Sequence, residues 1–379
     1  MKWKKTVSKI HLWLGLSTGL VVFILGITGA IYCFAPELQS FQPYRVVQEV
    51  NKPLLPPSHI QQIAENSLPG KVPQRIYYEA KNKAVMVLFS KKEAYSYSVF
   101  INPYNGNILK LRNNEKDFLS VVLQLHRTLL IPYGHEIIRW STVIFILLLV
   151  SGIILWWPKN KQTAKHGFKI MWCAHPKRLN YDLHKVLGFY ISWFVLFTAL
   201  TGLMFAFEDF AGLVYKSTGA DHSIIKQKPP LSEVTLLSAK KPVAIDRVWE
   251  KVWPDFYHKY ATMIFVLPSN ENGSILLRGN PEKGTIYKSD FRYFNQYTGQ
   301  EIPGAYVWGK YQDAKAAADY IRRMNYDIHT GAIFHLPGRI ALFFLALIVA
   351  SLPVTGFIYW VGKYKKAKTK KFRKIVTIT

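Results

Sequence analysis

Four long segments without a formally charged residue constrain the fold of this 379-residue chain more than any other feature. Each is long enough to cross about 30 Å of hydrocarbon as a helix rising about 1.5 Å per residue. We therefore expect an α-helical integral membrane protein with four transmembrane helices, at residues 12–36, 140–157, 186–207 and 340–362. The first segment exceeds the roughly 7 to 15 apolar residues of a signal peptide, so we expect an uncut signal anchor.

The positive charge of the chain is concentrated beside these segments. Residues 1–10, 158–185 and 362–379 hold 19 of the 49 basic residues but one of the 23 acidic ones. Alternating spans place all three stretches on one side, which the positive-inside rule makes the cytoplasmic side, together with both termini. The net charge of +26 thus indicates topology and contact with anionic membrane lipids, with no nucleic acid as partner. Cys33 and Cys173 then lie on opposite sides and form no disulfide.

The chain contains an internal repeat. At an offset of 173 residues one span matches another without a gap, and the second and fourth spans also correspond. Two spans per unit make the halves parallel repeats related by an axis near the membrane normal, so equivalent residues lie at equal depth. The matching positions are His11 and His184, Gly15 and Gly188, Thr28 and Thr201, Gly29 and Gly202, His126 and His329, Arg139 and Arg339, and the Ser-Gly152 and Thr-Gly356 dipeptides.

Each repeat carries an inserted extracytoplasmic segment with strand composition and glycine-containing turns, which predicts a small α+β domain. Expected strands include residues 75–78, 84–89 and 95–101 in the first domain, and 263–267, 274–277 and 292–295 in the second. The predicted organisation is a cytoplasmic tail and first span (1–36), first outer domain (37–116), His-bearing amphipathic helix and second span (117–158), basic loop (159–184), third span (185–207), second outer domain (208–311), His-bearing helix and fourth span (312–362), and basic tail (363–379).

Repeated histidines are the candidate functional residues. His11 and His184 each lie one turn before a glycine, Gly15 or Gly188, and small residues beside an imidazole leave room for a planar macrocycle. For one span alone, small-residue helix packing with an interfacial histidine explains the pattern better, but a symmetric pair favours a shared ligand. His126 and His329 are expected to lie on amphipathic helices before the second and fourth spans. His135 and His335 are second choices for this outer site.

Histidines in twos, without thiolates or carboxylates at membrane depth, favour haem iron with two axial imidazoles over tetrahedral zinc. The unmatched histidines are expected at the surface: His59, His166, His175, His222 and His258. Arg322 and Arg323 could attract anionic ligands near the outer site.

These residues resemble the PepSY-associated transmembrane family. The resemblance rests on the two His-x-x-Leu-Gly spans, Leu-His-Arg at 125–127, Ile-His-Thr-Gly at 328–331, the Ser-Gly-x-x-Leu-Trp-Trp end of the second span and the Asn-Pro-Tyr-Asn-Gly turn. It implies PepSY-like outer domains and a bacterial inner (cytoplasmic) membrane location. It also implies two b-type haems, with His11 and His184 as axial ligands of an inner haem and His126 and His329 of an outer one.

The resemblance further implies an oxidoreductase that reduces a ferric siderophore or other ferric chelate on the periplasmic side for iron uptake. Residues 363–379 are too few for the flavin module that some relatives carry, so we expect a separate electron donor, a quinol or a cytoplasmic flavoprotein. The main alternative is a membrane sensor or scaffold without redox chemistry, whose PepSY-like domains bind peptide or inhibit a protease. A permease built from repeats is a third reading, which predicts broken helices within the spans.

Overall fold

The computed structural model describes residues 2–91, 94–158, 160, 164, 167–220, 229–233, 243–304 and 309–376. The chain forms two compact units, and the chain passes between them four times. The membrane unit comprises Met1–Phe34, Val122–Ala211 and Ile328–Thr379, and the sheet unit comprises Ala35–Val121 and Gly212–Asp327. His166 and His222 lie outside the described residues.

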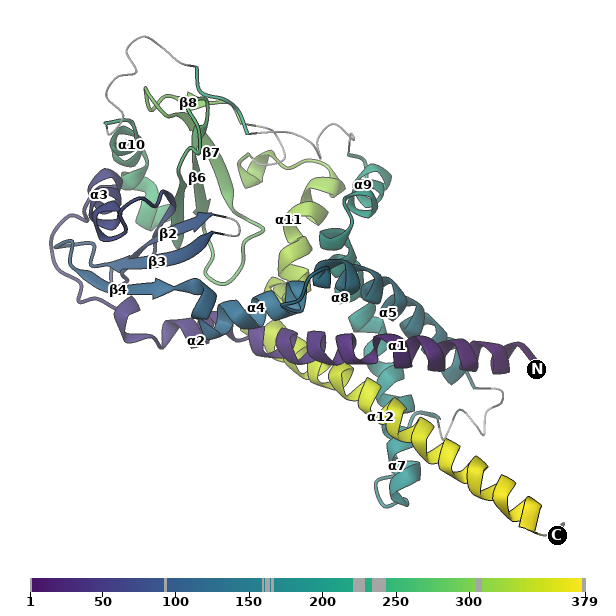
Figure 1. Cartoon of the computed structure of the whole chain (residues 1–379). Coiled ribbons are helices and arrows are strands. Elements are labelled where there is room, and N and C mark those ends of the chain that lie inside the picture. Colours follow the sequence, from purple (N-terminus) through teal and green to yellow (C-terminus); the bar gives the residue numbers. More distant parts are fainter. Residues whose placement is uncertain are drawn as a thin grey trace. The chain divides into compact units, whose positions relative to one another are not determined.

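Four long helices, visible as coiled ribbons in Figure 1, dominate the membrane unit. Each contains a stretch long and apolar enough to span a membrane, so the chain is a multi-pass membrane protein. The helix α1 packs against α5 and α12, and α8 packs against the same two helices. The four helices therefore form a ring in which α1 and α8 lie at opposite corners. The bounds are α1 (Lys2–Tyr32), α5 (Gly134–Trp156), α7 (Pro176–Asp182), a π-helical turn (Leu183–Leu187), α8 (Gly188–Ala206) and α12 (His335–Val376).

The helices extend beyond the uncharged segments from which they were predicted. The first begins at Lys2, ten residues before the predicted span, and the last continues to Val376. Lysine and arginine are good helix formers whose long side chains reach water from helix ends, so the basic flanks continue the helices. His11 therefore lies in the third turn of α1 instead of at its start. The single internal proline of α12, Pro353, leaves the helix continuous.

Close approach between α1 and α12 explains part of the glycine pattern. A Cβ at Gly26 would lie 2.9 Å from the carbonyl oxygen of Ala346 and from the side chain of Ala350, and a Cβ at Gly19 would lie 3.2 Å from Pro353. These glycines allow backbone contact between the two helices, as small residues do in membrane helix packing.

The sheet unit is built on one antiparallel sheet of eight strands in the order β4-β3-β2-β1-β5-β6-β7-β8. Buried and less buried residues alternate along β2, as expected when one face of a strand is covered. The strands are β1 (Pro73–Tyr78), β2 (Val85–Lys91), β3 (Tyr95–Ile101), β4 (Ile108–Asn113), β5 (Thr262–Val266), β6 (Ser274–Asn280), β7 (Asp290–Asn295) and β8 (Glu301–Ile302). The other α-helices in the described residues are α2 (Ala35–Ser40), α3 (Pro57–Ser67), α4 (Phe118–Thr128), α9 (Glu208–Ser217), α10 (Val243–Lys259) and α11 (Ala317–His329).

The strand segments predicted from sequence are confirmed, but they form one sheet instead of two. The strand β1 pairs with β5, with Ile76 opposite Phe265, and so joins the segments predicted as separate domains. Helices α3 and α10 contribute Ile60 and Phe256 to the core that covers one sheet face. The backbone N–H and the hydroxyl of Ser58 on α3 donate to Asp246 on α10, at 3.0 and 2.5 Å. Edge strands that hydrogen-bond to each other lose their exposed edges, which favours the joint sheet over two separate ones.

Candidate functional site

The structure brings the four matched histidines together in two pairs within the membrane unit. The ring centroids of His11 and His184 are 6.4 Å apart with an interplanar angle of 86°. The centroids of His126 and His329 are also 6.4 Å apart, with an angle of 67°. All four rings are partly buried. We refer to His11 and His184 as the first pair, and to His126 and His329 as the second pair.

Helices α5 and α12 hold the first pair in place. Nδ1 of His11 lies 2.8 Å from the hydroxyl of Ser151 on α5, and a Cβ on the next residue, Gly152, would lie 3.6 Å from Cε1 of His11. His184 makes the equivalent contacts with α12 through Thr355, at 3.0 Å, and Gly356, whose Cβ would lie 3.2 Å from Cε1. His184 lies in the π-helical turn that precedes α8, a feature frequent at functional sites.

The second pair makes the same hydroxyl and glycine contacts as the first pair, but with different helices. Nδ1 of His126, on α4, lies 2.9 Å from the hydroxyl of Thr28 on α1, and the ring packs against Gly29. Nδ1 of His329, on α11, lies 3.1 Å from the hydroxyl of Thr201 on α8, and its ring packs against Gly202. Each histidine thus meets a dipeptide of a hydroxyl residue followed by glycine, which we call a hydroxyl–glycine clamp.

Hydrogen bonding at the clamps favours one tautomer of each ring. Each clamp hydroxyl lies within hydrogen-bond distance of a carbonyl of its own helix: Ser151 of Leu148, Thr28 of Ile24, Thr355 of Ser351 and Thr201 of Thr198, at 2.7–3.1 Å. A hydroxyl that donates to its carbonyl accepts from the imidazole, which places the ring proton on Nδ1. Backbone partners agree at three rings, because Nδ1 of His184 lies 3.1 Å from the Leu352 carbonyl, Nδ1 of His329 lies 3.1 Å from the Thr198 carbonyl and His126 makes a backbone hydrogen bond at Leu25. In this tautomer the unprotonated Nε2 of each neutral ring is able to bind a metal.

The 6.4 Å separation tests which metal the rings fit. A metal–imidazole bond is about 2.0 Å long, and the ring centre lies about 1.2 Å behind the nitrogen. Two rings on opposite sides of one metal would have centroids about 6.4 Å apart, whereas two ligands at a tetrahedral angle would have them about 5.2 Å apart. The centroid separation of both pairs equals that of the opposed arrangement, in which two imidazoles bind haem iron.

The clustering of other donor groups points in the same direction. In the part of the chain that the structure describes, no group of three or more His, Cys, Asp or Glu side chains is placed to hold a metal. Structural zinc needs four protein ligands and catalytic zinc three. The residues at both pairs therefore fit two axial ligands of a macrocycle-bound iron better than a zinc site.

The surroundings of the second pair favour neutral imidazoles. Burial, together with the neighbouring His329, lowers the pKa of His126 to about 4. Burial also lowers the pKa of His329. Both rings are uncharged near neutral pH, as metal ligation requires.

The second-choice ligands are not part of either pair. His135 is exposed and lies 3.6 Å from Glu136, and His335 is exposed at the start of α12. His59, His175 and His258 are exposed as predicted. An exposed imidazole can form hydrogen bonds with water in place of a clamp. The spacing of the histidines along the sequence did not reveal which rings are exposed and which are partly buried.

The predicted roles of two arginines and two glycines have different outcomes. Arg323 is 4% exposed and donates to the carbonyls of Ser289 and Gly309, so its charge serves the packing of α11 and the expected surface role is wrong. Arg322 is partly buried beside the ring of Tyr215. A Cβ at Gly15 or Gly188 would make only ordinary contact with one leucine, at 3.8 and 3.7 Å, so helix packing alone does not require these glycines.

Sequence reasoning did not identify the clamp hydroxyls as site residues. The signal was nevertheless present, because Thr28-Gly29 and Thr201-Gly202 match across the repeat, and Ser151-Gly152 matches Thr355-Gly356. From the sequence alone, these dipeptides are recognised only as matching positions of the internal repeat. Their side chains act on histidines 98 to 171 residues away in the sequence, a relation that periodicity does not reveal.

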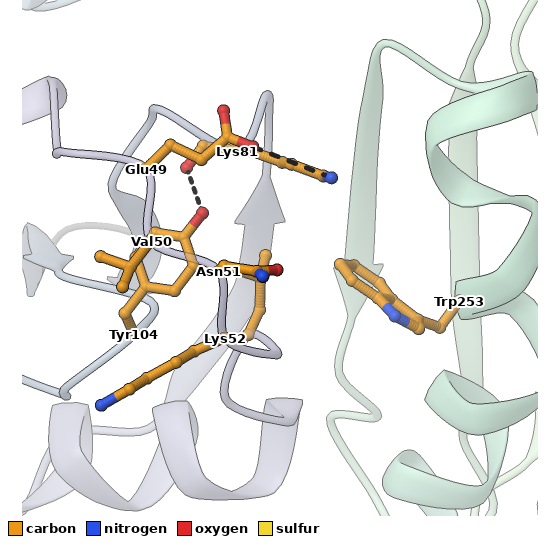
Figure 2. Close-up of a pocket in the computed structure, with 8 residues that line it drawn as sticks. Glu49, Val50, Asn51, Lys52, Lys81, Tyr104 and Trp253 are labelled. Atoms are coloured by element: carbon orange, nitrogen blue, oxygen red, sulfur yellow. Dashed lines mark hydrogen bonds and ion pairs between the residues drawn. The ribbon is translucent and has the colours of Figure 1, made fainter.

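The sheet unit has a separate, open pocket of about 520 Å³. Figure 2 shows Trp253 facing Lys81 and Glu49, which form an ion pair at 3.8 Å. Both charged side chains are about half exposed, and Tyr104 donates to the Lys81 carbonyl. The pocket is lined by Glu49, Val50, Asn51, Lys52, Leu54, Lys81, Tyr104 and Trp253, and so contains none of the matched histidines.

A comparison with protein families finds one that covers most of the chain. No curated protein matches the chain. A family model described as "PepSY-associated TM region" matches residues 8–363, which include all four spans, both histidine pairs and the sheet unit. The chain therefore belongs to the family of the PepSY-associated TM region.

Proposed function

We propose that this protein is a haem-containing electron-transfer protein of the bacterial inner membrane that reduces a ferric siderophore or other ferric chelate. The observation that carries the proposal is the pair of 6.4 Å histidine separations, each between rings whose Nδ1 atoms lie within hydrogen-bond distance of a clamp hydroxyl. A scaffold without a cofactor has no need for two such sites.

The two halves are, in this proposal, parallel repeats. The mirrored strand order around the β1–β5 contact supports this, as does the match between the clamps of His11 and His184 and between those of His126 and His329. Each iron would then be shared by equivalent histidines of the two repeats.

The levels of the two pairs suit transfer across a membrane. Along α1, His11 and the Thr28 clamp of the second pair are 17 residues apart, and the same interval separates His184 and Thr201 along the third span. Seventeen residues of helix rise about 26 Å, close to the roughly 30 Å thickness of the hydrocarbon. With the basic segments on the cytoplasmic side, the first pair would hold an inner haem and the second an outer haem, with both termini cytoplasmic.

The two b-type haems would supply reversible one-electron chemistry at the irons. The chain would supply the axial imidazoles, with Gly15 and Gly188 beside the inner ones. The clamps hold each ring in one orientation and tautomer, so little rearrangement accompanies a change in iron charge. Between the two levels lies an apolar cluster that includes Val22, Val195 and Val349 and excludes water.

One electron delivered on the periplasmic side would convert chelated Fe(III) to Fe(II). The softer, less highly charged Fe(II) is held less tightly by oxygen ligands selected for Fe(III), so the iron is released for uptake. The electron would come from a quinol or a cytoplasmic flavoprotein, as a separate partner. The enzyme class that follows is a ferric-chelate reductase.

The alternative is a peptide-binding sensor or scaffold that acts through the sheet unit. The open pocket and the exposed edge strand β4, with Ile108 and Leu111 at 46% and 40% exposure, are where such a partner would bind. This reading assigns no role to the histidine pairs.

The test is an absorption experiment on the full chain purified in detergent after expression with ample haem. Two haems per chain with low-spin b-type bands, and oxidation of the dithionite-reduced protein by a ferric siderophore, would support the proposal. A colourless protein would refute it. Full haem loading without oxidation by any ferric chelate would refute the substrate and leave the haem sites standing.

A further inference from the structure

Two arginines at corresponding positions of the two halves lie just beyond the second pair. Arg339, on α12, is 7% exposed and donates an Nη1 proton to the Cys33 carbonyl at 3.2 Å. Cys33 follows Gly29 by four residues and its N–H donates to the Gly29 carbonyl, so it lies one turn, about 6 Å, past the His126 clamp.

The matching arginine has an equivalent position in the other half. The guanidinium of Arg139, on α5, lies 4.4 Å from the ring centre of Phe207. Phe207 follows Gly202 by five residues, about 7.5 Å past the His329 clamp, and its N–H donates to the Leu203 carbonyl. Phe205, on the same turn, contacts His329 at a centroid distance of 5.5 Å. Each arginine thus reaches the end of the helix that carries a clamp of the second pair.

Both guanidiniums belong to the membrane unit and lie at the ends of apolar spans. Arg139 also bonds Glu136 on its own helix at 2.7 Å, with the arginine side chain 26% exposed. An arginine within a membrane-spanning helix is a candidate functional residue, since hydrocarbon disfavours a charged side chain. The planar guanidinium fork binds carboxylates in a bidentate manner, which lysine cannot do.

Protohaem carries two propionate carboxylates on one edge of the ring. Charged groups favour the aqueous end of a membrane site, and at the second pair that is the direction in which α1 and α8 continue from the clamps to Cys33 and Phe207. Two carboxylates and two arginines, one from each half, then meet at one end of the site.

From this placement we infer that Arg139 and Arg339 bind the propionate carboxylates of the haem held by the second pair, one arginine to each carboxylate. The inference rests on the proposed haem function and adds the residues that select a dicarboxylate porphyrin and set which edge faces outward. Arg139 exchanges or shares its contact with Glu136 when the propionate binds.

The test uses the full chain with His11→Ala, which removes one ligand of the first pair and leaves the second pair as the measured site. Apo-protein in detergent is titrated with haem and with its dimethyl ester, which lacks the two charges but keeps the iron and the ring. The parent chain should bind haem roughly tenfold or more tightly than the ester. The Arg139→Gln/Arg339→Gln chain should lose most of that preference, whereas Arg127→Gln, an exposed charge beside His126, should keep it.

Equal affinity of the parent chain for haem and ester would overturn the inference without any arginine substitution, so misfolding of an arginine variant cannot decide the result. A preference that survives in the double arginine variant would overturn the assignment to these residues. No haem bound by the wild-type chain would instead overturn the proposed function, and the inference with it. As a second readout, the midpoint potential of the bound haem should fall in the double variant, because a nearby cation favours the reduced, less positive iron.

Discussion

The two histidine pairs differ in the helices that build them but agree in geometry. The first pair lies on α1 and the π-helical turn before α8, and its clamps come from α5 and α12. The second pair lies on α4 and α11, and its clamps come from α1 and α8. Both have centroids 6.4 Å apart. The shared geometry therefore comes from the repeated clamp and from the relation between the halves, not from one particular helix arrangement.

A second difference concerns the hydrogen-bond partners of the rings. His11 meets a clamp hydroxyl, whereas the other three paired rings meet a clamp hydroxyl and a backbone group, which is Leu352 for His184, Thr198 for His329 and Leu25 for His126. The first pair thus combines one ring with a single partner and one ring with two. Four substitution experiments examine these two comparisons.

The largest effect is expected from removing a ligand. Alanine at any of the four paired histidines should abolish haem at its own pair and leave the other pair occupied, because the two sites share no ligand. Haem per chain and the reduced-minus-oxidised spectrum measure this. His135→Ala and His335→Ala are matched controls, since both rings are exposed, and loss of haem in either would contradict the assignment.

Blocking the space beside the first pair should have a nearly equal effect. Gly15 lies one turn after His11, and a Cβ there meets only Leu148 at 3.8 Å, so Gly15→Ala should be tolerated. Gly15→Leu should exclude a macrocycle from the first pair while the second pair stays loaded. Ser17→Leu, on the exposed side of α1, is the control. Equal haem content in Gly15→Leu and wild type would show that no macrocycle lies beside this glycine.

Smaller effects are expected at the clamp glycines, with a graded order. A Cβ would lie 3.1 Å from His329 at Gly202 and 3.2 Å from His184 at Gly356, but 3.5 and 3.6 Å away at Gly29 and Gly152. Alanine at the first two positions should displace the ring and weaken haem binding by about 1 kcal/mol or more. Alanine at the other two should change little. Titration of the apo-protein with haem ranks the four variants, and the reverse order would contradict the account.

The smallest effects concern the clamp hydroxyls. An acceptor on Nδ1–H makes the imidazole a stronger donor and stabilises Fe(III), so its removal should raise the midpoint potential. Ser151→Ala removes a bond worth about 1 kcal/mol, or roughly 40 mV for one electron. Thr355→Val should give a smaller rise, because the Leu352 carbonyl still lies 3.1 Å from Nδ1 of His184. Redox titration of the first-pair haem in both variants tests this, and a larger shift for Thr355→Val would contradict it.

Much of this arrangement could be predicted from the sequence because it depends on patterns that can be recognised along the chain. Uncharged length predicted the spans, strand composition and turn residues predicted the strands, and the internal repeat predicted which histidines correspond. The joint sheet could not be predicted in the same way, since the β1–β5 pairing joins residues almost 190 positions apart. The clamps were missed for the same reason, although their dipeptides were visible.

The remaining differences between prediction and structure concern which polar side chains are buried. Arg323 and His135 look alike in a sequence as polar residues near an outer site, but one is 4% exposed and bonded to carbonyls while the other faces solvent. Which polar side chain a fold buries depends on neighbours from distant segments. A repeated position, as for the four paired histidines, was the better guide to which side chains meet in the structure.

The most direct test of the central claim is the haem content of double variants that distinguish the pairing of ligands. If each pair holds one iron, His11→Ala/His184→Ala should retain about one haem per chain, and so should His126→Ala/His329→Ala. The crossed variant His11→Ala/His126→Ala should retain none, although it too lacks two histidines. Equal haem content in the crossed and uncrossed variants would contradict the claim that these pairs are two separate bis-histidine sites.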